Sequence, residues 1–272
     1  MTRLGLLGGG TIARLVLEQL RQGALPGYEV TAVAGRAAGP RARSLAAEFS
    51  LPYAGGGDAL RALRPDVVLE AASHDAVREH LVAMLDAGIS VVVLSAGALA
   101  DDRLRLDAET AARASGALLY VPSGGIGGLD ALKAACIAGV DSVTIEVAKP
   151  PAAWRGIDFV DRLGIDLDRL DGAVTLFHGV ARAGAPHFPQ NVNIAAVLGL
   201  AGVGMDRTLL KVVADPGLTR NTHTIVVNGV SGRFSIVLAN EPSPGNPKTS
   251  VLACVSALAA LRELSAHHRY GT

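Results

Sequence analysis

Hydrophobic and polar residues are arranged in alternating blocks along the first 120 residues of the chain. Short apolar runs rich in Val and Leu, bounded by Gly or Pro, occupy 3–8, 28–35, 65–73, 89–97 and 117–124. The stretches between several of them have the length and mixed polarity of helices, and they span 11–22, 40–49, 75–87 and 101–115. Strands that are apolar on both faces and alternate with helices predict a parallel sheet covered on both sides, an α/β doubly wound domain.

The pattern changes from about residue 140. Strand-like runs with more polar alternation and hairpin-like spacing follow at 141–149, 173–185, 207–215, 222–232 and 232–240, and a helix pattern interrupts them at 191–204. This arrangement predicts a second α+β domain with antiparallel strands. The segment from Asn246 to the end is expected to form a long helix, with Asn246 as its cap and Pro247 at its first position.

These patterns predict two domains. The first spans 1–122 and the second 123–245, and the helix expected over 246–272 packs back on the first domain.

The sequence GGGTIA follows the first predicted strand and opens the first predicted helix. Gly8, Gly10 and Ala13 stand where the dinucleotide-binding fingerprint places small residues. Gly8 would make the tight turn, and Gly10 would let a pyrophosphate approach the helix N-terminus, where Thr11 and Ile12 begin the helix. The pattern alone also fits a plain strand–helix turn, but its place on the first strand of a βαβ run favours dinucleotide binding.

The end of the second predicted strand bears on the choice of cofactor. No carboxylate stands there to hold a ribose 2′-hydroxyl, whereas Arg36 is present, followed by Arg41 and Arg43. An arginine can pair with the 2′-phosphate of NADP, although surface arginines without a ligand would look the same. Ser73 ends the third predicted strand and His74 follows it, where we expect the nicotinamide ribose.

Three polar clusters in the second half are candidates for substrate and cofactor contacts. His223 heads a strand and could act as general acid and base, or it could be a surface residue. Asn191 precedes a helix, where asparagine often serves only as a cap. Lys248 and Thr249, in the first turn of the expected last helix, would suit a substrate carboxylate, unless Lys248 is a surface lysine.

Composition narrows the class of partner. The 272 residues include 25 basic and 25 acidic ones, so no charge excess points to nucleic acid or an anionic membrane. Half the residues are hydrophobic, which excludes a disordered chain. Cys136 and Cys254 each lie in an apolar stretch, as buried reduced thiols do. No signal pattern or membrane-length apolar run is visible, and we expect a cytoplasmic protein with small-molecule partners and no metal site.

Several of these blocks occur together in one known family. They are GLLGGGTIA, EAASHDAVREH, VVVLSAGAL, PSGGIGGLDAL, AKPPAAW, HFPQNVNIAAVLGLAGVG, ADPGLTRNTHTI and NPKTS. Over nearly its whole length the chain resembles the L-aspartate dehydrogenases. The resemblance implies a Rossmann-type domain and an α/β substrate domain, and oxidation of L-aspartate by NAD or NADP to iminoaspartate, which hydrolyses to oxaloacetate and ammonia.

The resemblance also implies roles for single residues. His223 takes the place of the catalytic histidine, and Asn191 and Gly125 take the places of dinucleotide contacts. The family usually has Ala where Gly125 stands, so this position departs from its pattern. We expect a homodimer. The alternatives are a related NAD(P)-dependent imine or semialdehyde reductase, or a dinucleotide-binding sensor without catalysis; the presence of His223 disfavours the sensor.

Overall fold

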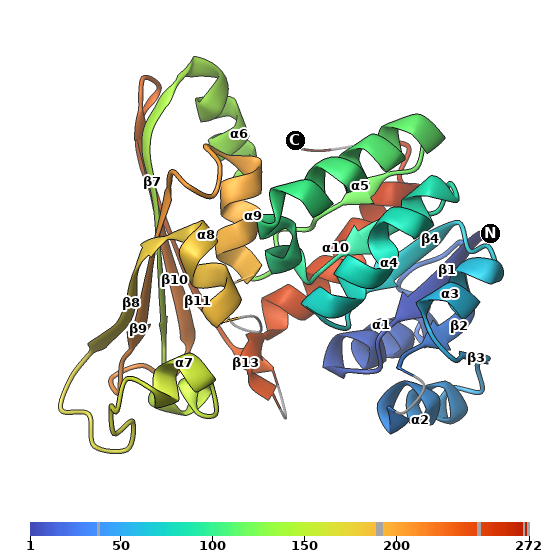
Figure 1. Ribbon diagram of the computed structural model, residues 1–272, viewed down its shortest axis with the longest axis horizontal. Helices are drawn as coiled ribbons and strands as arrows, with labels where there is room; N and C mark the ends of the chain where they lie inside the picture. The colour runs from blue at the N-terminus through green and yellow to red at the C-terminus, as the bar shows by residue number, and fades with distance from the viewer. Residues whose placement is uncertain (37–38, 189–192, 244–245, 269, 271–272) are drawn as a thin grey trace. The chain divides into compact units, whose positions relative to one another are not determined.

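The computed structural model describes residues 1–36, 39–188, 193–243, 246–268 and 270 (Figure 1). The chain divides into two compact units. The first comprises Met1–Pro122 together with Cys254–Arg269, and the second is built on Ser123–Ala253.

The first unit contains a six-stranded parallel sheet in the order β3-β2-β1-β4-β5-β6. The strands are β1 (Thr2–Leu7), β2 (Tyr28–Ala34), β3 (Tyr53–Ala54), β4 (Val67–Glu70), β5 (Ser90–Val93) and β6 (Leu119–Tyr120). The helices are α1 (Thr11–Arg21), α2 (Pro40–Glu48), α3 (Gly57–Ala62), α4 (His74–Asp86), η1 (Ala96–Ala100) and α5 (Asp102–Ser115). The predicted doubly wound fold is confirmed. The sequence pattern missed β3 and α3, because neither is long enough to form a periodic apolar run.

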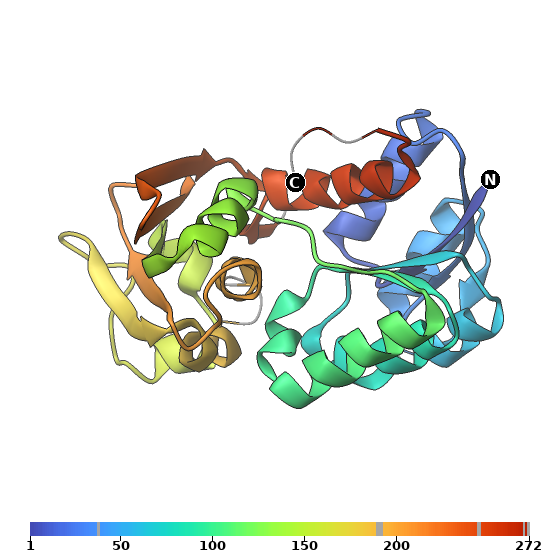
Figure 2. The same ribbon diagram turned by 90° about the horizontal axis from the view of Figure 1, so that it is seen from above.

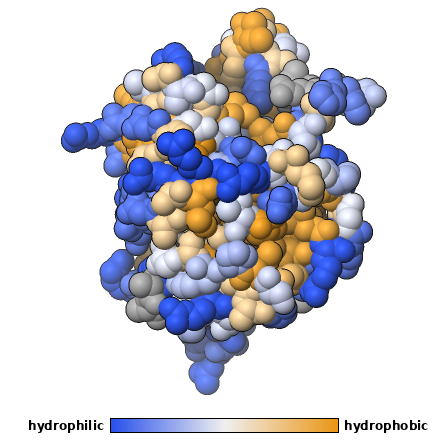
Figure 3. Space-filling model, turned by 90° about the vertical axis from the view of Figure 1, so that its right-hand side faces the viewer, coloured by the Kyte–Doolittle hydropathy of each residue, from blue (hydrophilic) through white to orange (hydrophobic). Residues whose placement is uncertain are grey.

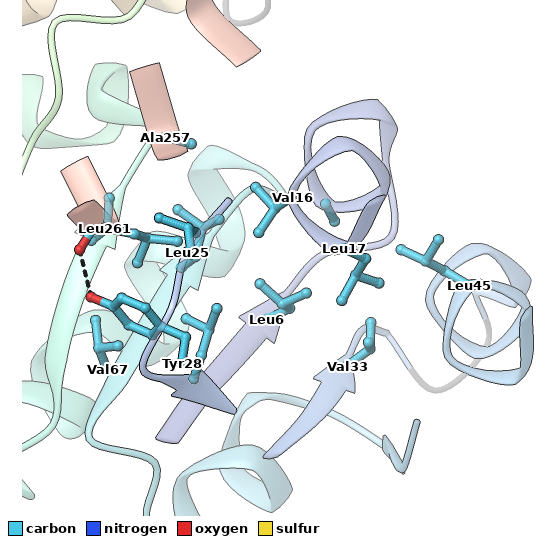
Figure 4. Packing of buried hydrophobic residues seen from close by; sticks show 14 of the residues in the cluster. Leu6, Val16, Leu17, Leu25, Tyr28, Val33, Leu45, Val67, Ala257 and Leu261 are labelled. Atoms are coloured by element: carbon cyan, nitrogen blue, oxygen red, sulfur yellow. Dashed lines mark hydrogen bonds between the residues drawn. The ribbon is translucent and has the colours of Figure 1, made fainter. Parts of the chain in front are cut away.

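Helices cover both faces of this sheet. Figure 2 shows α1 and α10 (Val251–Ser265) on one side of the strands and α4 and α5 on the other. Leu6 and Val33 of the sheet, Val16 of α1 and Leu261 of α10 belong to one buried apolar cluster (Figure 4). The Tyr28 hydroxyl donates to the Leu261 carbonyl oxygen at 2.6 Å, so α10 is bound to the sheet by packing and by a buried hydrogen bond.

The outer surface fits this layered packing. On the face drawn in Figure 3, hydrophilic side chains are interspersed with apolar ones. Amphipathic helices that bury one side against a sheet leave such a mixed surface on the other.

The second unit contains a five-stranded sheet in the order β11-β10-β7-β9-β8. Its strands are β7 (Val140–Lys149), β8 (Val174–Val180), β9 (Thr208–Ala214), β10 (Asn221–Gly229) and β11 (Gly232–Asn240), and its helices include α6 (Leu129–Ala138), η2 (Pro151–Trp154), α7 (Asp158–Asp161), α8 (Ala181–Gly184), η3 (Ala185–His187) and α9 (Asn193–Ala201). The prediction of an antiparallel sheet is wrong at one pair, since β7 and β9 are parallel. The long connection between them, which includes β8 and α9, allows this crossover.

Two further local predictions are corrected. The run 173–185 leaves strand conformation after Val180, and α8 follows. The last helix begins at Val251 and not at Asn246, because Asn246–Ser250 forms strand β13 and pairs with β12 (Pro242–Ser243). Asn246 precedes a proline and Thr249 is β-branched, and both features favour extended backbone. Of the two free cysteines, Cys254 is buried as expected and Cys136 is partly exposed.

Candidate active site

The glycine-rich turn between β1 and α1 is shaped first by contacts within the chain. Gly8 has a φ of 126°, and a Cβ there would lie 2.4 Å from the carbonyl oxygen of Ala71. A Cβ on Gly9 would lie 2.4 Å from the Cα of Ala42. A Cβ on Gly10 would meet nothing within 4 Å. Gly8 and Gly9 are therefore required by the fold itself, and only Gly10 leaves open space for a ligand.

The N-terminus of α1 adjoins that open space. Gly10 is the N-cap residue, no side chain caps the helix, and its first turn contains no acidic residue. Thr11 and Ile12 are partly buried in this turn, and Ala13 is buried against the sheet. Free N–H groups and the positive end of the helix dipole favour an anion here.

A buried carboxylate organises the neighbouring turn. Glu70 ends β4 and is 2% exposed. Its Oε1 accepts hydrogen bonds from the backbone N–H groups of Ala72 (2.7 Å) and Ser73 (3.1 Å) and from the Ser95 hydroxyl (2.9 Å), and its Oε2 accepts from the Ser95 N–H (2.9 Å). Burial raises the pKa of Glu70, and these hydrogen bonds oppose the rise. Ser73 caps α4, whose first residue is His74, so Glu70 fixes the turn that carries both.

Arg36 lies just after β2 and is exposed. Its carbonyl oxygen accepts a hydrogen bond from the Gly39 N–H at 2.8 Å, and the Tyr53 hydroxyl lies 3.4 Å from the same oxygen. The guanidinium of Arg43 lies 5.0 Å from the centre of the Tyr53 ring. Tyr53 thus contacts both the backbone of Arg36 and the guanidinium of Arg43 beyond the end of β2.

His223 is buried in the second unit, although a histidine near a strand end is usually exposed. It is 2% exposed and shares the covered face of β10 with Asn221, Ile225 and Val227. Its Nδ1 lies 2.9 Å from the carbonyl oxygen of Gly125. The Asn240 amide nitrogen donates to the same oxygen at 2.8 Å and lies 3.2 Å from Nδ1. Both side chains therefore converge on one backbone carbonyl.

This geometry decides which ring nitrogen of His223 carries the proton. The Gly125 carbonyl can only accept, so Nδ1 is the donor in the neutral ring and Nε2 keeps its lone pair. Nε2 is buried and has no hydrogen-bond partner among the described residues. Burial and, to a smaller extent, the Lys149 ammonium lower the pKa of His223 to about 4, against the opposing effect of the Gly125 hydrogen bond. The ring is therefore a neutral base at pH 7 with Nε2 available for a proton.

Other polar side chains gather at the same edge of the sheet. Because β10 runs antiparallel to both β7 and β11, its start lies beside their ends. Lys149 ends β7 and Asn240 ends β11, and both are buried. Asn221 donates from Nδ2 to the Ser250 hydroxyl at 3.3 Å, which ties β13 to this edge. The second unit thus concentrates a base, a cation and two amides in one place.

The predicted contacts near the last helix are only partly described. Asn191 lies outside the described residues. The backbone of Lys248 lies in β13, so it is not in a helix turn as predicted, and its side chain lies outside the described part. Thr249 is partly buried beside Ser250 in the same strand.

Two kinds of feature are absent from the described residues. None of the helices in this part of the chain is long and apolar enough to cross a membrane. No group of three or more His, Cys, Asp or Glu side chains within it is arranged to hold a metal ion.

Comparison with known proteins assigns the whole chain. Residues 130–264 match the family described as aspartate dehydrogenase, C-terminal, and residues 8–122 match the NAD-binding domain of homoserine dehydrogenase. The chain is 40% identical over 272 residues to L-aspartate dehydrogenase of Methanocella arvoryzae, covering 100% of both proteins. It belongs to the L-aspartate dehydrogenase family.

Further relatives agree with this assignment. L-aspartate dehydrogenase 2 of Bordetella pertussis is 48% identical over 214 residues, which cover 78% of this chain and 79% of that one. The crystal structure of aspartate dehydrogenase from Thermotoga maritima superposes with a TM-score of 0.73 at 25% identity and covers 100% of both chains. A hyperthermophilic archaeal homoserine dehydrogenase shares the fold, with a TM-score of 0.60 at 12% identity.

The first unit fits the dinucleotide of an L-aspartate dehydrogenase. The space left at Gly10, the uncapped first turn of α1 and the arginines after β2 are suited to a pyrophosphate and an adenosine phosphate. Members of the family use NAD or NADP, and these local features are chemically suited to phosphate groups.

Three buried residues at strand ends were not predicted as site residues from the sequence. They are Glu70, Lys149 and Asn240. The hydrophobic pattern of the strands gave a signal for Lys149 and for Asn240. Lys149 continues the alternate positions of Val143, Ile145 and Val147, and Asn240 is in phase with the inward residues of β11. A charged or amide residue in the apolar phase of a strand therefore marked the site.

Proposed function

We propose that this protein oxidises L-aspartate to iminoaspartate with NAD or NADP, and that the imine is hydrolysed to oxaloacetate and ammonia, with reductive amination as the reverse direction. The observation that carries the proposal is the buried His223, whose Nε2 is a free base, in a chain that belongs to the L-aspartate dehydrogenase family over its full length.

The chemistry divides between cofactor and protein. Bound NAD or NADP supplies the two-electron acceptor for the hydrogen on Cα of L-aspartate. The Nε2 of His223 takes a proton from the substrate ammonium, or from the water that attacks the imine, and returns it in the reverse direction. The hydrogen bond from Nδ1 to Gly125 holds the ring in the tautomer that this step needs.

Substrate charge is expected to strengthen this base. In the free protein, burial and Lys149 hold the pKa of His223 low. L-aspartate brings two carboxylates, and a negative charge near an imidazole favours its protonated form. Substrate binding therefore moves the pKa of His223 upward, toward the range in which it exchanges protons efficiently.

The predicted contacts are assigned to ligands as follows. Gly8, Gly10, Thr11 and Ile12 hold the pyrophosphate, and the other dinucleotide contacts are Ser73, His74, Gly125 and Asn191. Arg36 pairs with the 2′-phosphate of NADP, so we expect NADP to be accepted at least as well as NAD. Lys248 and Thr249 contact a substrate carboxylate.

A screen of purified protein tests the reaction. L-aspartate, homoserine and other amino or semialdehyde substrates are offered with NAD and with NADP, and reduced dinucleotide is measured. We expect L-aspartate to give the highest kcat/KM. A higher value for another imine or semialdehyde substrate would establish the alternative reductase, and dinucleotide binding without turnover would establish a sensor.

His223→Ala tests the assigned base. Loss of a general acid and base lowers kcat by roughly 10²–10⁴-fold, while NADP binding measured by fluorescence titration should be nearly unchanged. His178→Ala is the matched control, because His178 is an exposed residue of β8. Near wild-type turnover by His223→Ala would remove His223 from the mechanism.

We further propose a cytoplasmic homodimer. The outward face of the second sheet supports it, because Leu209 of β9 and Val237 of β11 are 41% and 63% exposed there. Sedimentation should give twice the 27.8 kDa mass of one chain, and a monomer at micromolar concentration would contradict the proposal.

A further inference from the structure

Lys149 is an ammonium group buried in an apolar sheet face. It is 2% exposed and follows Val143, Ile145 and Val147 along the covered face of β7. Removing an ammonium group from water is costly unless the site provides for its charge. Lys149 therefore places a positive charge on the covered face of the second sheet.

The position of Lys149 relates it directly to His223. Val147 pairs with His223 in the register between β7 and β10, and Lys149 lies two residues further along the same face. The positive charge of the Lys149 ammonium acts on the His223 ring and helps to lower its pKa. The cation and the base therefore lie at the same edge of the sheet.

An aromatic residue holds the ammonium in place. Nζ of Lys149 lies 5.4 Å from the centre of the Trp154 ring, within reach of a cation–π interaction. Trp154 is fully buried, and its indole N–H donates to the Val213 carbonyl oxygen at 3.0 Å. An edge contact with Phe188, 5.7 Å between ring centres, fixes the other side. Pro150 and Pro151, directly after Lys149, begin the turn that brings Trp154 back over it.

Lys211, a lysine on the neighbouring strand, provides a comparison with Lys149. Lys211 of β9 pairs with Glu146 of β7 in the register, and its Nζ forms an ion pair with Glu146 at 2.8 Å. The side chain of Lys211 is 44% exposed and that of Glu146 is 40% exposed. Lys211 thus forms an ordinary surface ion pair, whereas Lys149 is enclosed beside the candidate base.

We propose that the Lys149 ammonium binds one of the two carboxylates of the substrate beside His223, and so helps to select an amino dicarboxylate. This inference rests on the proposed function. A carboxylate at Lys149 would make a charge-assisted hydrogen bond in a site closed to water. It would also offset the positive field of Lys149 at His223, so that substrate binding itself would activate the base.

Lys149→Met tests the proposal, with Lys211→Met as its matched control. Succinate, a dicarboxylate without the reacting amine, is titrated calorimetrically into each protein saturated with NADP. We expect the succinate Kd and the KM for L-aspartate to rise roughly tenfold or more in Lys149→Met, while the Kd for NADP is unchanged. Lys211→Met should behave as wild type. Unchanged succinate affinity in a folded Lys149→Met variant would overturn the proposal.

A pH profile separates binding from a merely structural role. Because Lys149 lowers the pKa of His223, its removal should move the acid limb of kcat/KM upward, toward the ordinary histidine value. An acid limb that does not move counts against the proposal.

Lys149 can still be tested if the protein does not oxidise L-aspartate or if Lys149→Met does not fold. If the wild-type protein does not oxidise L-aspartate, the proposed function fails, and the succinate titration still tests Lys149 by itself. If Lys149→Met does not fold, a crystal structure of the wild-type protein with succinate decides the question. A carboxylate within hydrogen-bond distance of Nζ supports the proposal, and succinate bound elsewhere overturns it.

Discussion

At the scale of single residues, one backbone carbonyl determines the state of the base. Gly125 accepts from both His223 and Asn240, and this shared acceptor places the proton on Nδ1. The carbonyl belongs to the loop before α6, and its two donors lie on β10 and β11. The loop that the family resemblance gives as a dinucleotide contact is therefore bonded directly to the candidate base.

The departure from the family pattern at Gly125 can be tested there. A Cβ at this position would lie 3.4 Å from Cε1 of His223 and 3.7 Å from Nδ2 of Asn240, which is ordinary van der Waals contact, and Gly125 does not have a positive φ. Gly125→Ala should therefore raise the free energy of unfolding by about 0.4–1 kcal/mol through the unfolded state and keep kcat close to wild type.

Gly124→Ala is the control for this prediction. Gly124 has a φ of 65°, so alanine there is strained and should destabilise the protein. Urea unfolding followed by fluorescence compares the two variants. A destabilised Gly125→Ala protein would show that the loop needs glycine at both positions.

At the scale of elements, strand ends carry the polar chemistry of both units. In the first unit Glu70 ends β4 and joins the turn before α4 to the turn after β5 through its four hydrogen bonds. In the second unit the ends of β7 and β11 and the start of β10 supply the buried polar side chains. Side chains at strand ends can reach a ligand while the strand interiors remain packed.

Glu70→Gln tests the turn in the first unit. The amide replaces one accepting oxygen by a donor, so at least one N–H or hydroxyl loses its acceptor in a buried place, at a cost of about 1–3 kcal/mol. Because the turn carries Ser73 and His74, we also expect a higher KM for NADP with a smaller change in kcat. Circular dichroism in urea and initial rates measure the two effects, and exposed Glu29→Gln is the control. Wild-type stability and KM in Glu70→Gln would contradict this role.

At the scale of the whole molecule, each unit contains a buried acid or base with a shifted pKa, Glu70 in the first and His223 in the second, and the two groups respond to pH in opposite directions. The pKa of His223 is lowered, so the folded second unit binds fewer protons than the unfolded chain between about pH 6.5 and 4. Its stability therefore falls as pH falls through that range. The pKa of Glu70 is raised, so the first unit loses stability as pH rises through the raised value.

The loss of stability at acid pH can be followed specifically in the second unit of the intact protein, because the single tryptophan of the chain, Trp154, is buried there. Followed by its fluorescence, the free energy of unfolding should decrease by up to about 3 kcal/mol between pH 7 and pH 4. His223→Gln removes the titrating group and should flatten this dependence. Equal slopes in the two proteins would show that His223 does not titrate with the lowered pKa.

Much of the fold follows from local pattern. Apolar runs that alternate with helices were enough to predict the parallel sheet of the first unit, because strands buried on both faces have few polar residues. The spacing of Gly8 and Gly10 after the first strand also predicts a dinucleotide site at that turn, and this assignment stays a prediction. The motif blocks were sufficient to identify the family and to predict its reaction.

Tertiary structure decided what depends on residues far apart in the chain. The parallel pairing of β7 with β9 and the strand conformation of Asn246–Ser250 come from pairing partners, which local propensity does not contain. Gly9 is required by Ala42, across the packing of α2. The tautomer of His223 depends on the Gly125 carbonyl, and its low pKa depends on burial and on Lys149, all from other elements. The sequence by itself determined which residue types were available, and only folding set their burial and partners, because desolvation and hydrogen bonding act through space.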